Sequence, residues 1–168
     1  MELLISGYGA AGEQTIVKCN EYGEVSWSDT IESPSFVTVC GDRMFAVTEN
    51  DNYAWIHSYV KAGQGYRLAD SARFDGTDLC HVCYSETHNM VFGACWGSGH
   101  LLYATLDAQG KFIKTDSILQ ENETDDASLI SRAHFVGVNK AEDTLMVNNV
   151  GLDIIYFYSI HNGELVEK

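Results

Sequence analysis

The sequence predicts an all-β fold in the form of a partial β-propeller, and three observations support this prediction. Short runs of alternating apolar and polar residues, separated by turn residues, recur along all 168 residues. No long stretch shows the apolar period of 3.6 that is typical of an amphipathic helix. A four-strand outline also repeats about every 45 to 54 residues, which is the spacing of propeller blades.

Residues 79–120 contain the clearest copy of this outline. Four strands are expected, at residues 81–84, 90–95, 101–106 and 112–118. Turn residues separate them, with Asn89 before the second strand and with Gly97 and Gly99 before the third. Because successive strands joined by short turns pair in antiparallel fashion, this segment predicts one four-stranded sheet.

The outline recurs on both sides of this segment. Residues 33–76 and residues 131–168 each contain four strand-like runs in the same order. Residues 1–30 contain three runs, which match the second, third and fourth strands of the unit. The final run, residues 163–168, already serves as the fourth strand of the last blade and cannot complete the first. We therefore expect a single domain, residues 1–168, with about three and three-quarter blades.

Charge and hydropathy argue against two classes of partner. Twenty-four acidic and ten basic residues give a formal net charge of −14, which repels the phosphates of nucleic acids and anionic lipid surfaces. No apolar run is long enough to cross a membrane, and the first residues lack the basic start and apolar core of a signal peptide. We therefore expect a cytoplasmic protein that binds neither nucleic acid nor membranes.

The cysteines are expected to be structural. They lie in strand-like segments, at Cys19, Cys40, Cys80, Cys83 and Cys95. An odd number of cysteines in a reducing compartment suits small buried apolar side chains. Cys80 and Cys83 have the spacing of half a zinc site, but residues three apart in a strand face opposite sides of the sheet, and no second such pair exists. We expect no metal and no cofactor.

Three linked motifs resemble those of a known family. They are Ser33–Phe36 with Phe45–Asn50, Leu79–Val82 with Ala94–Gly99, and Arg132–Val136 with Asn149–Asp153. In order and spacing they are similar to the SPSFL…LYAVNE, PCHV…ANYGSGSV and PHAH…ADLGLDRV motifs of the seven-bladed β-propeller lactonases of the 6-phosphogluconolactonase type. The resemblance covers nearly the whole chain, and it implies a propeller fold and lactone chemistry.

The chain departs from the family pattern at two motif positions and in length. Arg132 stands where the family usually has the first histidine of PHAH, and Asn149 stands in place of an aspartate. The later GPRH and NEL motifs of the family have no counterpart. Seven blades of about 45 residues need roughly 300 residues, so the chain resembles the N-terminal half of a lactonase propeller.

Blade geometry predicts where chemistry would occur. The start of the first strand and the loop between the second and third strands lie at the same end of every blade, so these segments gather at one mouth of the central channel. Lactone hydrolysis needs a base for water and a donor for the oxyanion. The expected base is His134 or His81. Glu49 is expected to orient the base or to replace it, and Arg132 to hold an oxyanion or a carboxylate.

Three further residues are expected to contact the substrate at this mouth, namely Asn149, Asp153 and Trp96. Structural interpretations remain open for several of these residues. His81 and His134 can bond the backbone of a neighbouring blade, and Asp153 can cap its own turn. Trp96 can stack on a sugar ring or pack between blades.

The resemblance implies metal-independent hydrolysis of a sugar lactone or a carboxylated lactone, with a small lactone or sugar acid as the ligand. Because an unclosed run of blades leaves two faces bare, we expect a homo-oligomer or a complementary half-propeller chain that completes the ring. Two alternatives remain open, a non-catalytic binding or assembly module and an inactive truncated lactonase. The acidic segment 121–126 is expected at the channel mouth, where it would disfavour a phosphorylated substrate.

Overall fold

A computed structural model describes residues 1–168, and it contains fifteen β-strands and no helix. The predicted all-β class is confirmed. With strands alone, the structure has no candidate for a membrane-spanning helix. The strands pair only with their neighbours in the sequence, and they form four separate antiparallel sheets.

The sheets follow the repeat. The first blade holds β1 (Glu2–Ser6), β2 (Ile16–Asn20) and β3 (Val25–Asp29). The second blade holds β4 (Val37–Cys40), β5 (Arg43–Asn50), β6 (Tyr53–Ala62) and β7 (Gly65–Phe74). The third blade holds β8 (Leu79–Ser85), β9 (Met90–Cys95), β10 (His100–Leu106) and β11 (Phe112–Leu119). The fourth blade holds β12 (Ala133–Val138), β13 (Thr144–Asn149), β14 (Ile154–His161) and β15 (Glu164–Glu167).

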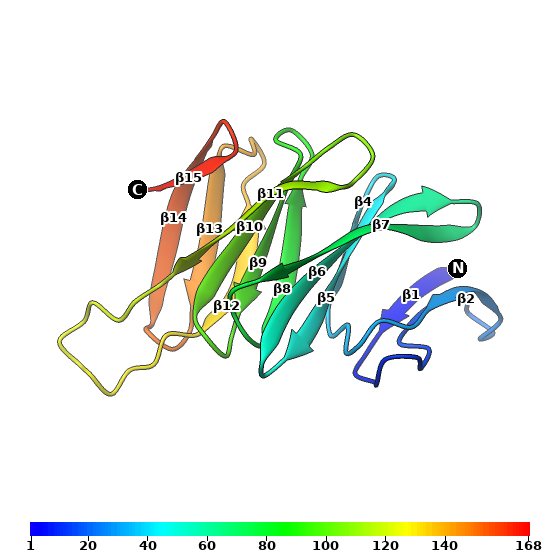
Figure 1. The fold of residues 1–168 in the computed structure, drawn as a ribbon, viewed down its shortest axis with the longest axis horizontal. Coiled ribbons are helices and arrows are strands. Elements are labelled where there is room, and N and C mark those ends of the chain that lie inside the picture. The colour runs from blue at the N-terminus through cyan, green and yellow to red at the C-terminus, as the bar shows by residue number, and fades with distance from the viewer.

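The four blades stand side by side in chain order, from the N-terminal blade at one end to the C-terminal blade at the other (Figure 1). Three blades have four strands, and the first blade has three, because no strand precedes β1 at its inner edge. This arrangement confirms the predicted partial propeller of about three and three-quarter blades.

Alternation along the strands gives the middle blades two apolar faces. On β5, Phe45 and Val47 point toward the third blade, whereas Met44 and Ala46 point toward the first. A cluster of 12 buried apolar residues fills the interface between the second and third blades. A cluster of 11 fills the interface between the third and fourth blades. Burial of these flat faces is what stabilises one blade against the next.

The interface between the first and second blades is smaller. Its buried apolar cluster has four members, which are Ile16, Met44, Ala46 and Tyr59. Trp27 of β3 covers this cluster and packs directly on the backbone of Gly65, where a Cβ atom would lie 2.1 Å from the indole. Only glycine permits this close approach of the two blades.

A β-bulge determines the directions in which the side chains of the two cysteines on β8 point. The register of β8 against β9 shifts after Leu79, which leaves Cys80 as the extra residue. The Cys80 sulfur lies 3.6 Å from the carbonyl oxygen of His134, and Cys83 packs against the cluster that joins the third and fourth blades. Both thiols therefore face β12, and the expected placement on opposite faces is wrong because the bulge interrupts the alternation. All five cysteines are unpaired.

Candidate functional site

One end of the blades gathers the segments that the motifs pointed to. The N–H of Asp78 donates to the carbonyl of Asn50 at 2.8 Å, and the N–H of Trp96 donates to the carbonyl of Asp78 at 2.9 Å. The guanidinium of Arg132 donates to the carbonyl of Trp96 at 3.3 Å. These bonds connect the second, third and fourth blades in turn. We call the end marked by Glu49, Asp78, Trp96 and Arg132 the channel mouth.

Arg132 is fixed at the channel mouth by an aromatic ring. Its guanidinium carbon lies 3.8 Å from the centroid of the Trp96 ring, in a cation–π contact. Trp96 remains 41 % exposed, so this stacked pair stays accessible to a ligand. Stacking of this kind holds the planar donor group in one orientation, and a fixed fork of N–H groups suits a carboxylate or an oxyanion.

Two carboxylates share the channel mouth with Arg132. Burial raises the pKa of Asp78, the negative charges of Glu49 and Asp51 raise it further, and Arg132 lowers it. Glu49 accepts a hydrogen bond of 3.0 Å from the hydroxyl of Tyr8, which follows β1. Burial raises the pKa of Tyr8, and the bond to Glu49 adds to this effect. All four blades therefore contribute a polar side chain to the channel mouth.

The two histidines lie on neighbouring innermost strands. His81 of β8 packs between two phenyl rings, with ring centroids 4.3 Å from Phe36 and 4.5 Å from Phe135. Burial lowers the pKa of His81, and the nearby charge of His134 lowers it further. The Nδ1 atom of His81 accepts a long bond of 3.5 Å from the N–H of Val136. His134 is the bulged residue of β12, and its side chain is exposed.

Asn149 is buried, and its amide is fully used by the protein. The oxygen accepts from the N–H groups of Arg132 at 2.8 Å and Leu152 at 3.2 Å. The nitrogen donates to Ser131 at 2.8 Å and to Gln120 at 3.0 Å. An amide offers two donors and two acceptor positions, so none is left for a ligand. In this structure Asn149 positions the backbone of Arg132.

Asp153 lies in the turn that precedes β14. Its φ of 57° is in the left-handed region, which aspartate tolerates better than most residues. It borders a shallow recess together with Asn148, Val150 and Ile155. The geometry of Asp153 is thus that of a turn residue beside the channel mouth.

The acidic segment 121–126 lies elsewhere. Glu121 and Glu123 line a recess with Tyr156 and Glu167, on the outer strands of the fourth blade. For these two residues the expected position at the channel mouth is wrong, because the segment leaves β11, the outermost strand of its blade. Their charges therefore give no argument against a phosphorylated substrate.

Two residues of the channel mouth were not predicted. Asp78 carries a φ of 50° directly before β8, and a polar residue before an innermost strand is the signal that could have identified it. Tyr8 lies between two glycines in the loop after β1, and nothing in the motifs pointed to it. No cluster of three or more histidine, cysteine or carboxylate side chains is arranged to hold a metal ion.

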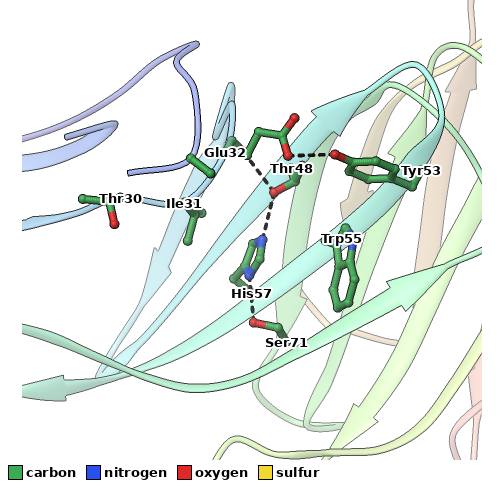
Figure 2. Close-up of a pocket in the computed structure, with 9 residues that line it drawn as sticks. Thr30, Ile31, Glu32, Thr48, Tyr53, Trp55, His57 and Ser71 are labelled. Atoms are coloured by element: carbon green, nitrogen blue, oxygen red, sulfur yellow. Dashed lines mark hydrogen bonds between the residues drawn. The ribbon is translucent and has the colours of Figure 1, made fainter. Parts of the chain in front are cut away.

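A separate cavity of about 280 Å³ opens between the first and second blades (Figure 2). It is lined by Ala11, Thr30, Ile31, Glu32, Thr48, Tyr53, Trp55, His57 and Ser71. His57 is 9 % exposed and bonds Thr48 at 2.9 Å and Ser71 at 2.8 Å. Burial lowers the pKa of His57 to about 4, so the imidazole is neutral at physiological pH. We call this space the interblade cavity.

The four blades and the channel mouth define part of a β-propeller. The model of one family, described as "Lactonase, 7-bladed beta-propeller", matches residues 3–168. The chain belongs to this family of propeller lactonases. Among curated proteins, none matches the chain.

Solved structures show the same fold over about half of their length. A 6-phosphogluconolactonase candidate from Bacteroides uniformis superposes with a TM-score of 0.81 at 19 % identity, over 99 % of this chain and 53 % of that one. The corresponding candidate from Bacteroides fragilis gives 0.80 at 18 % identity, over 97 % and 49 %. A periplasmic gluconolactonase from Pseudomonas aeruginosa gives 0.76 at 17 % identity, over 94 % and 49 %. The chain thus spans about half the length of these relatives.

Proposed function

We propose that this chain supplies half of a lactone-hydrolysing propeller, with the channel mouth as the substrate site. The observation that supports the proposal is the grouping of Arg132, Glu49 and Asp78 at the channel mouth in a member of the lactonase family. The histidine pair lies on the neighbouring innermost strands β8 and β12. The related structures are described as sugar lactonases. A sugar lactone or a carboxylated lactone is therefore the substrate class that we propose.

The side chains at the channel mouth suit a metal-independent mechanism. His134, whose imidazole is exposed, takes a proton from a water molecule, and the resulting hydroxide adds to the lactone carbonyl carbon. Arg132 stabilises the oxyanion of the tetrahedral intermediate. When the ring C–O bond breaks, the imidazolium returns the proton to the leaving alkoxide and a hydroxy acid is released. His81 or Glu49 is the alternative base in this scheme.

The exposed face of the fourth blade supports the proposal that a further blade completes the ring. Leu101 and Tyr103 of β10 are 0 % and 6 % exposed, because the fourth blade covers them. Ile155 and Phe157 occupy the same register positions on β14 but are 53 % and 44 % exposed. At the other end, Ile5 of the first blade is 53 % exposed. Apolar faces of this kind favour association with another blade.

The partner that covers these faces is either a second copy of the chain or a complementary half-propeller chain. Multi-angle light scattering across a concentration series distinguishes them: a dimer supports the second copy, and a stable monomer supports a separate chain. A monomer that gains lactonase activity only when the complementary half of a propeller lactonase is added would identify the latter.

Hydrolysis assays test the catalytic proposal. The chain, alone or in its assembled form, is expected to hydrolyse glucono-lactone, 6-phosphoglucono-lactone or a carboxymuconolactone. Arg132→Ala should lower kcat/KM about 100-fold, as expected for the loss of an oxyanion donor. Arg67→Ala, which removes an exposed guanidinium on β7, is the matched control and should leave the rate unchanged. Ligand binding without turnover in every assembly would favour the non-catalytic binding module instead.

We also propose that the protein works in a reducing compartment, as a cytoplasmic protein does. The five unpaired cysteines support this proposal. The Pseudomonas relative is described as periplasmic, so the compartment needs its own test. Cell fractionation that recovers the protein with periplasmic markers would contradict the proposal.

A further inference from the structure

The interblade cavity is complete within this chain, in contrast to the channel mouth. One wall is formed by the connection from β3 to β4, with Thr30, Ile31 and Glu32, and by Ala11 of the first blade. The other wall is formed by β5, β6 and β7 of the second blade (Figure 2). Neither wall depends on a further blade, so the cavity can bind a ligand whether or not the ring is closed.

Two hydroxyl groups that line the cavity, those of Thr48 and Ser71, can act only as acceptors toward a ligand. The hydroxyl proton of Thr48 goes to the carbonyl of Glu32 at 3.0 Å, so the bond between Thr48 and His57 must be donated by Nε2–H of the imidazole. The Nδ1 atom is then unprotonated and accepts a hydrogen bond from the hydroxyl group of Ser71. The hydroxyl groups of Thr48 and Ser71 thus both donate to other protein atoms. The Ser71 oxygen can still accept a hydrogen bond from a ligand.

Glu32 adds a negative charge to this set of acceptors. Its two carboxylate oxygens accept from Asn50 at 3.0 Å and from the Tyr53 hydroxyl at 2.8 Å, and each oxygen keeps a second acceptor position. No lysine or arginine lines the cavity. Arg73 contacts the ring of Tyr53 at 5.8 Å but is not part of the lining. A phosphate or carboxylate ligand would therefore meet like charge and find no cation.

Aromatic rings form the apolar part of the cavity. Tyr53, Trp55 and His57 alternate along β6 and share the face toward the first blade (Figure 2). The Trp55 ring is nearly parallel to the imidazole, with an interplanar angle of 12° and 6.4 Å between centroids. Ile31 lies on the other wall. A flat apolar surface beside acceptor groups fits a ligand with an apolar face and hydroxyl donors at its rim.

We propose that the interblade cavity binds one neutral pyranose ring. The ring stacks on Trp55, and its hydroxyl groups donate hydrogen bonds to the carboxylate of Glu32. The cavity volume of about 280 Å³ is just below the range of roughly 300 to 1,000 Å³ that is typical of small-molecule sites, which favours a single ring over a chain of rings. This site differs from the proposed lactonase site in place and in preferred charge, and it does not rest on that proposed function.

The test uses the full chain labelled with 5-fluorotryptophan, whose fluorine resonances report separately on Trp27, Trp55 and Trp96. Methyl β-glucopyranoside is the probe, since it has no lactone to hydrolyse. The probe should shift the Trp55 resonance in a saturable manner and leave Trp96 of the channel mouth unchanged. Methyl β-glucuronide, the same ring with a carboxylate, should bind at least about tenfold more weakly, because its charge faces Glu32.

A matched pair of variants locates the site. Glu32→Gln should weaken binding of the glucopyranoside about tenfold, as for loss of hydrogen bonds to a charged group, and should remove the discrimination against the glucuronide. Glu49→Gln makes the same change at the channel mouth and should leave both affinities unchanged. The proposal is overturned if no fluorine resonance responds, if Trp96 responds in place of Trp55, if the glucuronide binds as well as the glucopyranoside, or if only Glu49→Gln weakens binding. The comparison of the two sugars on the unchanged chain decides the matter even where a variant fails to fold.

Discussion

The interfaces between blades differ in kind along the chain. The second, third and fourth blades meet through 12 and 11 buried apolar residues, whereas the first and second meet through four. At that first interface, a hydrogen-bonded histidine and a cavity of about 280 Å³ replace part of the apolar packing. The same blade unit therefore forms dry interfaces that serve stability and one polar interface that has room for a ligand.

The difference arises from a few positions on β5 and β6. On the face toward the third blade, Val47 and Ile56 form a register pair and are fully buried. On the face toward the first blade, the neighbouring pair is Thr48 and Trp55, and His57 follows. Polar and aromatic side chains at these positions keep the first blade from closing on the second, since a buried polar group must retain its hydrogen bonds.

The largest expected effect is at a dry interface. Phe92 of β9 is fully buried between the third and fourth blades. Phe92→Ala should lower the free energy of unfolding by about 3 to 5 kcal/mol, because it removes buried apolar surface and leaves a cavity. Urea unfolding measures this value. Ile113→Ala, at a site that is 69 % exposed, is the control and should change stability by less than about 0.5 kcal/mol. Equal effects would mean that Phe92 is not buried between the two blades.

The polar interface should respond to pH where the dry interfaces do not. His57 has a pKa of about 4 in the folded chain against 6.5 for the free side chain. Between these two pH values the unfolded chain binds more protons than the folded chain. The contribution of His57 to the free energy of unfolding is therefore fully present above pH 6.5 and is lost as the pH decreases toward 4. The loss for this one group is about 3 kcal/mol at most.

Comparison with His57→Gln isolates the contribution of the histidine. Urea unfolding across this pH range should give a shallower slope for His57→Gln than for the unchanged chain, because carboxylates titrate in both proteins. Parallel slopes would show that the imidazole is not buried in its neutral form.

Much of the fold could be predicted because the strand signals are local. Alternation and turn residues placed a strand at 90–95, the range of β9, and one at 112–118, which β11 extends by one residue. The repeat then grouped these strands into blades. The bulge at Cys80 could not be predicted, since it depends on how β8 pairs with β9, and it reversed the expected orientation of one thiol.

The candidate site was predictable only as far as the blade repeat reached. Equivalent positions in successive blades placed Arg132 and Glu49 at one end of the channel. Tyr8 reaches Glu49 from the first blade through tertiary packing alone. The motif also did not predict that Asn149 is buried and that its side chain accepts a hydrogen bond from the backbone N–H of Arg132. The interblade cavity depends on which faces of two blades meet, and no local pattern encodes that.

A smaller effect is expected where the first blade touches the second most closely. A Cβ atom on Gly65 would lie 2.1 Å from the ring of Trp27, which is itself held by Tyr59 and Tyr66. Gly65→Ala should therefore lower the free energy of unfolding by about 1 to 3 kcal/mol. Gly7→Ala is the control, because nothing lies within 4 Å of a Cβ at that position. Hydrogen exchange should accelerate in β1–β3 and not in β8–β15. Uniform acceleration would mean that the first blade is not a separately weakened unit.

The smallest expected effect is a change in one side chain's titration at the rim of the interblade cavity. The pKa of Tyr53 is raised, first by its hydrogen bond to Glu32 and then by burial and by the charge of that carboxylate. Glu32→Gln removes the charge and keeps a hydrogen-bonding amide, so the pKa of Tyr53 should fall toward its ordinary value of 10.0. The charge of Asp51 also raises the pKa of Tyr53, as the smallest of the causes. Asp51→Asn should therefore lower it less than Glu32→Gln does. NMR titration of tyrosine labelled at Cζ measures both shifts. An unchanged pKa of Tyr53 in Glu32→Gln would mean that the carboxylate does not hold the phenol, and Glu32 would then not form the acceptor side of the cavity.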